Sequence, residues 1–256
     1  MKIYIYFLNM AQEFNSKQIK SFTLLLLSLQ KKNTILGFAI SLVPMLVTAF
    51  SIELFIGKII GGEVHADGMK GINAIFFIFF SNAILQSTEA LKNYGTIIKS
   101  SYLHPATVMI SESLLQYASF IVSFLVLALA FNISFEKSAL LILLSLLLAL
   151  YTLAVTNCLL VVSSILEDFG RILGIIFQML FWISPILYSV HMIKSDLVYI
   201  FMANPFYIFF ELISLIFSPQ SFDHHLFWWG LGSSLTFLAA LYLLLMNLRK
   251  KILVFL

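Results

Sequence analysis

Residues 205–217 read PFYIFFELISLIF, and this short apolar stretch decides how the rest of the chain is arranged. As a helix it reaches roughly 20 Å, whereas the hydrocarbon core of a membrane is roughly 30 Å thick. Asn204-Pro205 ends any helix that runs in from Leu197, because proline lacks an N–H and disfavours helical geometry at the residue before it. We therefore expect this segment to enter the membrane and return. Irregular backbone at that depth is tolerated only where it is buried in protein or lines a wet cavity. We therefore predict that this chain forms a pathway through the membrane and is not only a membrane anchor.

The composition of the whole chain is that of a membrane protein. Of its 256 residues, 61% are hydrophobic and 11% are charged, which is more apolar surface than a soluble domain can bury. Cys158 is the only cysteine, which excludes a disulfide within the chain. The first ten residues contain one lysine and an apolar stretch, but no small-residue cleavage site follows them, so we expect no cleavable signal peptide.

Six apolar runs are long enough to cross a membrane, and they predict an all-α integral membrane fold in a single transmembrane domain over residues 1–256. The predicted spans are 33–57, 71–88, 106–131, 139–164, 171–190 and 226–247.

The positive charges predict the orientation of these spans. With the N-terminus inside, 11 of the 15 Lys and Arg residues lie on the inner side and 4 on the outer side, as the positive-inside rule favours. Both termini are therefore predicted to be cytoplasmic, with residues 191–225 outside. A seventh span over 197–217 would put Arg249 to Lys251 outside and bury Asn204, Pro205 and Glu211 in lipid, so we reject it.

Residues 1–30, before the first span, mix apolar with polar and charged side chains. This pattern predicts an amphipathic helix that lies on the cytoplasmic surface of the membrane. A flexible leader is the alternative, and the high apolar content argues against it.

The chain contains none of the common catalytic or nucleotide-binding motifs. It has no G-x-x-x-x-G-K-[ST], no H-E-x-x-H and no G-x-S-x-G. Asp223-His224-His225 is no metal site, since adjacent histidines point to different faces of a helix. We expect neither catalysis nor a cofactor in this chain.

A few ionisable residues interrupt the apolar runs. Glu112 and Gln116 lie in the third predicted span, where a carboxylate usually faces the interior of the bundle. Glu112 is interpreted either as a pathway or gating residue or as a packing residue bonded to a neighbour such as Asn157. Glu53 and Glu211 either line an outer vestibule or simply lie at the interface.

Aromatic and small residues give weaker indications. Tyr188, Phe206 and Tyr207 are placed near the outer mouth, where they either belong to an aromatic belt or present ring faces to a passing ligand. Gly170 and Gly174 form a small-xxx-small pair that lets a neighbouring helix approach closely.

Three segments, in this order, match the pattern of a known family. They are FFIFFSNAILQSTEALKNYGTIIKSSYLHP (76–105), RILGIIFQMLFWISPILYS (171–189) and ANPFYIFFELI (203–213). The chain resembles the membrane subunit of bacterial type-2 ABC exporters for polysaccharides, which carry lipid-linked O antigen, capsule or teichoic acid chains. The resemblance covers nearly the whole chain.

The family pattern around the first span is matched in part. Lys31-Lys32, Leu36-Gly37 and Pro44 fit it, while Ile40 stands where a tryptophan is usual. At the coupling region Leu103-His104-Pro105 replaces the usual Phe-Pro-Arg, which bears on the detail of the ATPase contact.

The resemblance implies a homodimer of six-span subunits in the bacterial cytoplasmic (inner) membrane. Two copies of a separate ATPase subunit would bind ATP and Mg²⁺ beneath it, the cargo would be a lipid-linked glycan, and no nucleic acid is involved. Residues 89–105 would form the cytoplasmic coupling helix, through Glu89, Lys92, Asn93, Lys99, Tyr102 and His104. The re-entrant segment within 191–225 would shape the outer half of the channel, with Tyr188, Asn204, Pro205, Phe206, Tyr207 and Glu211.

Two other functions remain open at this point. The first is a type-2 permease for a drug or a lipid. The second is an integral membrane enzyme that acts on lipid-linked sugars, although the sequence lacks clustered Asp, Glu or His residues facing one membrane surface.

Overall fold

The structure is a computed structural model, and it describes residues 19–24, 36–55, 67–94, 105–166, 168–186, 204–219 and 224–254. In these ranges the chain forms helices and no strand. Besides a short helical turn at 19–24, the helices are α3 (Leu36–Ile52), α4 (Met69–Asn93), α6 (Pro105–Ala130), α7 (Phe135–Ile165), α8 (Phe169–Ile183), α10 (Tyr207–Phe217) and α11 (His224–Val254).

Four helical stretches of the described chain are long and apolar enough to cross a membrane. They are Met69–Ala90, Thr107–Ala130, Phe135–Leu159 and His224–Leu244. The predicted all-helical membrane character is thereby confirmed. Helices α3 and α8, which correspond to the first and fifth predicted spans, are shorter, with 17 and 15 residues.

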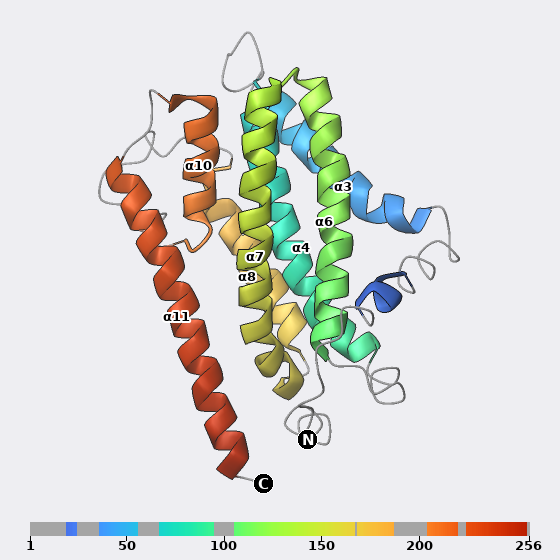
Figure 1. Cartoon of the computed structure of the whole chain (residues 1–256), viewed down its shortest axis with the longest axis vertical. Coiled ribbons are helices and arrows are strands. Elements are labelled where there is room, and N and C mark those ends of the chain that lie inside the picture. Colours follow the sequence, from blue (N-terminus) through green and yellow to red (C-terminus); the bar gives the residue numbers. More distant parts are fainter. Residues whose placement is uncertain are drawn as a thin grey trace.

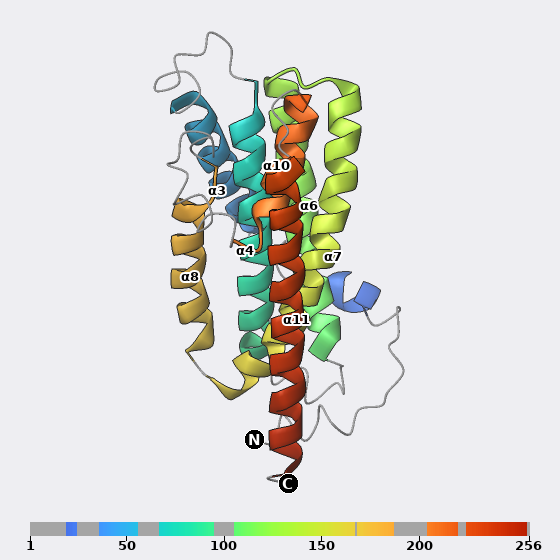
Figure 2. The ribbon, with the colours of Figure 1, turned by 90° about the vertical axis from the view of Figure 1, so that its left-hand side faces the viewer.

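Helix α4 is the centre of the bundle. Of its apolar window 78% is buried, against 17% for α11, which lies along the outside of the bundle (Figure 1). Helices α3 and α8 flank α4 on the same side, α3 nearer one end and α8 nearer the other (Figure 2). Four phenylalanines of α4, Phe76, Phe77, Phe79 and Phe80, are buried in the bundle, and the Phe76 ring meets the Phe120 ring of α6 edge-on at 5.1 Å. Interlocking aromatic rings therefore hold the central helices together.

Two predicted segments have different bounds in the structure. The predicted span 171–190 is not one helix, because α8 ends at Ile183 and Ser184 is extended, with ψ 143°. Pro185 explains this end, since proline disfavours helical geometry at the preceding residue. The predicted coupling helix 89–105 does not begin as a helix of its own. Its first residues are the last residues of α4, which ends at Asn93.

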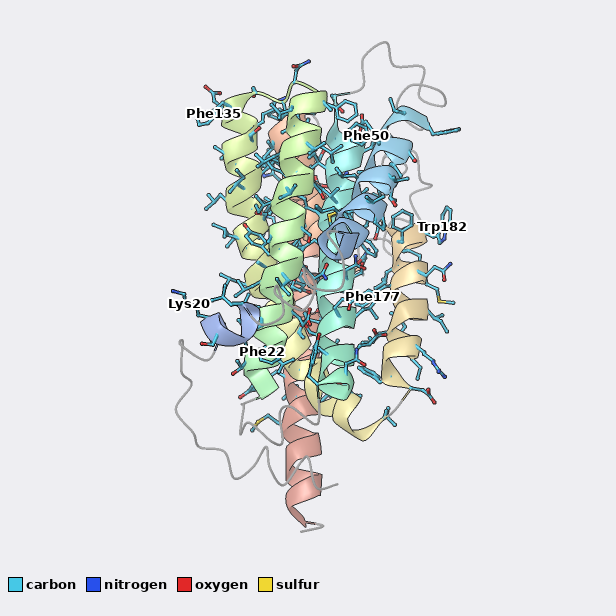
Figure 3. All side chains as sticks on the ribbon, turned by 90° about the vertical axis from the view of Figure 1, so that its right-hand side faces the viewer. Lys20, Phe22, Phe50, Phe135, Phe177 and Trp182 are labelled. Carbon is cyan, nitrogen blue, oxygen red and sulfur yellow. The ribbon has the colours of Figure 1, made fainter. Side chains whose placement is uncertain are left out.

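Residues 19–24 are the described part of the predicted surface helix. Phe22 is buried and meets the Tyr94 ring edge-on at 5.8 Å, while Lys20 is exposed (Figure 3). The Thr23 hydroxyl donates a hydrogen bond to Ser111 Oγ in α6 at 3.0 Å. This turn is therefore held against the ends of α4 and α6.

Glu53 joins the end of α3 to the start of α4. Its carboxylate accepts hydrogen bonds from Gly68 N at 3.1 Å and Gly71 N at 2.7 Å. The side chain is only 1% exposed, so it lines no vestibule in this structure. A carboxylate suits this place because the first N–H groups of a helix lack partners within it and carry partial positive charge.

Replacing Glu53 with glutamine should lower the free energy of unfolding by about 1–3 kcal/mol, because one charged acceptor of two N–H groups is lost. Thermal unfolding in detergent would measure this. The control is Gln86→Ala, which changes an exposed side chain of α4. Equal stability of the two variants would contradict the capping role of Glu53.

Candidate functional site

Two helices break off inside the bundle, and the broken ends meet. Helix α8 ends at Ile183 and is followed by Ser184-Pro185, while Asn204-Pro205 precede α10. Asn204 Nδ2 donates a hydrogen bond to Ser184 Oγ at 2.7 Å. Ser184 Oγ in turn donates to the Leu180 carbonyl in α8 at 2.6 Å. A buried polar contact thus joins two helices whose ends are 20 residues apart in the sequence. We name residues 184–186 and 204–206 the broken-helix junction.

The broken-helix junction lies halfway along the bundle. Tyr151, near the middle of α7, donates its phenolic hydrogen to the Pro205 carbonyl at 3.2 Å. At the other end of α10, Lys137 Nζ in the first turn of α7 donates to the Phe217 carbonyl at 3.3 Å. Helix α10 therefore runs beside one half of α7 only, from its middle to its start (Figure 1).

The irregular backbone of the broken-helix junction is provided with hydrogen-bond partners. Asn204 Oδ1 accepts from Phe206 N at 2.9 Å, and the Asn204 carbonyl accepts from Tyr207 N at 3.0 Å. The Pro205 carbonyl accepts a second bond, from Ser234 Oγ of α11, at 2.7 Å. Such partners are what makes non-helical backbone tolerable at membrane depth. Asn204 acts here as a turn-forming residue and as the link to α8.

Aromatic rings enclose the broken-helix junction. Phe206 is 0% exposed, and four phenylalanine rings lie with their centroids 4.8–5.7 Å from its ring. They are Phe77, Phe80, Phe209 and Phe210. Tyr207 is also 0% exposed, and its hydroxyl donates to Glu211 Oε2 at 3.0 Å.

This burial bears on the expected channel residues. Neither Phe206 nor Tyr207 presents a ring face to a passing ligand in this conformation. Tyr207 lies at the start of α10, next to the helix break, and the break lies beside the middle of α7. Glu211 is buried and bonded to Tyr207, so it lines no vestibule here. Tyr188 lies outside the described residues.

Helix α11 comes unusually close to the first turn of α10 at Gly230. A Cβ atom at this position would lie 2.8 Å from Tyr207 Cδ1 and 3.4 Å from the Ile208 backbone. Only glycine allows this approach without a shift of the neighbouring ring. The contact holds the first turn of α10 in place from the side opposite α4 and α7.

The predicted coupling residues are only partly described. Glu89 and Asn93 are exposed on the last turns of α4. The side chain of Lys92 and the whole of Lys99, Tyr102 and His104 lie outside the described residues.

Glu89 nevertheless shows how α4 meets α8. A Cβ atom at Gly170, in the first turn of α8, would lie 3.4 Å from Glu89 Cγ and 3.5 Å from Glu89 Oε1. These are ordinary van der Waals distances, and a Cβ atom at Gly174 would have no neighbour within 4 Å, so the described residues do not show the tight helix contact that the spacing of this pair predicted. The carboxylate lies over a helix N-terminus, where negative charge is favourable.

Glu112 and Gln116 are both buried on α6, each 7% exposed. The described residues show no hydrogen bond between Glu112 and Asn157, and Asn157 is exposed on α7. The packing partner that the sequence suggested is therefore not the right one. The nearby hydroxyls of Ser87 and Ser113 instead bond to each other at 3.3 Å across α4 and α6.

Several partners in the broken-helix junction escaped sequence reasoning. Ser184, Tyr151 and Ser234 carry its hydrogen bonds, and Gly230 sets its packing. One signal was available, because Ser184 precedes Pro185 just as Asn204 precedes Pro205. Two polar residues before prolines, each in an apolar run, predict two helix ends that need partners.

The arrangement joins the ends of two broken helices, and the described residues contain no group of three or more His, Cys, Asp or Glu side chains that could hold a metal ion. No family model matches the chain, and no curated protein shows significant similarity to it.

Proposed function

We propose that this chain is the permease subunit of an ATP-driven exporter that moves a lipid-linked polysaccharide across the bacterial cytoplasmic membrane. The functional unit is a homodimer of six-span subunits with both termini in the cytoplasm, and two copies of a separate ATPase bind beneath it. The cargo assignment rests on the segments 76–105, 171–189 and 203–213, whose order resembles the polysaccharide exporters.

The observation that carries the transport assignment is the broken-helix junction. Transporters commonly build their pathways with discontinuous helices that meet near the middle of the membrane. Two such helices meet here through Asn204 and Ser184, with α10 too short to cross. A simple anchor has no use for this arrangement, since breaking a membrane helix costs several hydrogen bonds that must be restored by other groups.

The contacts also suggest how force would reach the broken-helix junction. The end of α4 lies over the first turn of α8, through Glu89 and Gly170. Helix α8 ends at Ile183, and Ser184 directly after it is bonded to Asn204, which precedes α10. A partner that moves the cytoplasmic end of α4 would therefore shift α8 and, with it, α10. ATP binding can drive such a shift only through contacts that differ between the two states.

Loss of the chain in its own cell tests the cargo. Deletion of its gene should remove a surface polysaccharide and leave the lipid-linked glycan on the cytoplasmic side. Extraction measures the lipid-linked glycan, and labelling of intact cells measures the surface polysaccharide. Expression of the chain from a plasmid should return both to their normal amounts. A normal surface polysaccharide in the deletion strain would contradict the proposed cargo.

Cysteine labelling tests the proposed orientation. In a Cys158→Ser background, a cysteine at position 250 should react only with reagents that reach the cytoplasm. A cysteine within 191–203 should react with an impermeant reagent added outside. The charge distribution, with 11 of 15 Lys and Arg residues on the inner side, is the reason for this expectation. Outside labelling of position 250 would overturn the six-span topology.

The double variant Lys99→Ala, Tyr102→Ala tests the coupling segment. It should weaken co-purification with the ATPase or separate ATP hydrolysis from export, because residues 89–105 are expected to carry the contact. The control is Arg171→Ala, which removes an exposed cation in the first turn of α8, outside this segment. Unchanged assembly and export in the double variant would place the ATPase contact elsewhere.

A further inference from the structure

Glu112 and Gln116 lie one turn apart on the same face of α6, and both are more than nine-tenths buried. An ionised carboxylate at such a place is costly unless a cation or several donors compensate it. The spacing of four residues brings the two side-chain ends within reach of each other.

Among the side chains that the structure describes, which do not include that of Lys92, the surrounding elements supply no cation. Lys20, on the helical turn beside α6, is exposed, and Asn157 of α7 is exposed as well. Arg171, at the start of α8, is paired with Asp168. On α3, the carboxylate of Glu53 is bonded to the start of α4, at the far end of the bundle.

The neighbouring hydroxyl groups are bonded to other acceptors. Ser87 donates to the Met109 carbonyl or shares a bond with Ser113, and Thr88 donates to the Leu85 carbonyl. Tyr94 is the titratable neighbour at the end of α4. Burial raises the pKa of the Tyr94 phenol above its ordinary value, so this neighbour brings no positive charge to Glu112.

Gln116 adds an independent observation. Its Oε1 atom is buried and has no hydrogen-bond partner. An unpaired buried acceptor costs about 1–3 kcal/mol. Within the described part of the chain, the buried carboxyl has no cation beside it and the buried amide oxygen has no donor. One proton on the carboxyl would meet both needs, because it neutralises the carboxyl and supplies a donor to the amide oxygen.

We propose that Glu112 and Gln116 form a buried proton-binding site, in which Glu112 holds a proton and its carboxyl O–H donates a hydrogen bond to Gln116 Oε1. The proton comes from water and returns to it, and no other bond forms or breaks. The site requires neither the ATPase nor a cargo, so it stands independently of the proposed transport function. It distinguishes Glu112 from Glu53 and Glu211, which accept hydrogen bonds from Gly68, Gly71 and Tyr207.

Infrared spectroscopy of the purified chain in detergent at neutral pH tests this site. The wild-type chain should show the carbonyl stretching band of a protonated carboxylic acid. Glu112→Gln should abolish the Glu112 contribution to that band, and Glu89→Gln, at an exposed carboxylate, should leave the band unchanged. Gln116→Leu should displace the band, because the O–H loses its acceptor. Circular dichroism and gel filtration confirm that each variant is folded.

Two results would overturn the proposal. A band that is the same in wild type and folded Glu112→Gln would show that Glu112 is ionised. A band that does not move in Gln116→Leu would show that Gln116 is not the acceptor. If Glu112→Gln does not fold, the Gln116→Leu spectrum decides alone. With an ionised Glu112, the Gln116→Leu substitution would leave the carboxylic acid band unchanged, and the proposal would be overturned.

Discussion

Export should fall at least tenfold when Ser184 or Asn204 is replaced by alanine, because either change removes the bond that joins α8 to α10. The two variants should differ in stability. Asn204→Ala also leaves the buried Phe206 N–H without its acceptor, which costs about 1–3 kcal/mol. Ser184→Ala leaves that turn intact and leaves only Asn204 Nδ2 without its acceptor.

A double-mutant cycle separates the link from the turn. Export per assembled transporter is measured for Ser184→Ala, Asn204→Ala and the double variant. If the two residues act through one bond, the double variant should be no worse than Asn204→Ala alone. Strictly additive losses would show that the two residues act separately and that α8 does not move α10 through this contact.

Gly230→Ala should lower the free energy of unfolding by about 1–3 kcal/mol, the usual cost of overpacking a tight contact. The added methyl group would lie 2.8 Å from Tyr207 Cδ1 and 3.4 Å from the backbone of Ile208, so the first turn of α10 must move away. Because this turn follows the broken-helix junction directly, export should fall as well.

Gly232→Ala is the matched control, two residues further along α11. A Cβ atom at Gly232 has no neighbour within 4 Å, so this variant should be unchanged or more stable by about 1 kcal/mol. Thermal unfolding in detergent compares the two. Equal stability of Gly230→Ala and Gly232→Ala would show that the close contact of α10 and α11 is absent.

The helices were largely predictable from the sequence because their apolar runs are long. The predicted spans 71–88, 106–131 and 139–164 lie within or close to α4, α6 and α7. Pro205 also marked the start of a short helix, and α10 begins two residues after it. Length and proline position are local properties, and they are visible without knowledge of any contact.

The partners across the bundle were not predictable in the same way. Whether Glu53 lines a vestibule or caps α4 depends on where the chain returns after it. The end of α8 at Ile183 was missed, because an apolar run through Pro185 looks continuous by composition. The position of α10 along the bundle depends in the same way on a contact across it, the bond from Tyr151 to the Pro205 carbonyl.

Purified components test the central claim most directly. The chain and its ATPase are reconstituted in liposomes with a labelled lipid-linked glycan on the side where the ATPase binds, and protection from an added glycosidase is followed. The glycan should become protected only with both proteins, ATP and Mg²⁺, and Asn204→Ala should abolish this protection while the complex stays assembled. Protection that appears without ATP, or never appears with the complete complex, would contradict the account of this chain as the permease of a polysaccharide exporter.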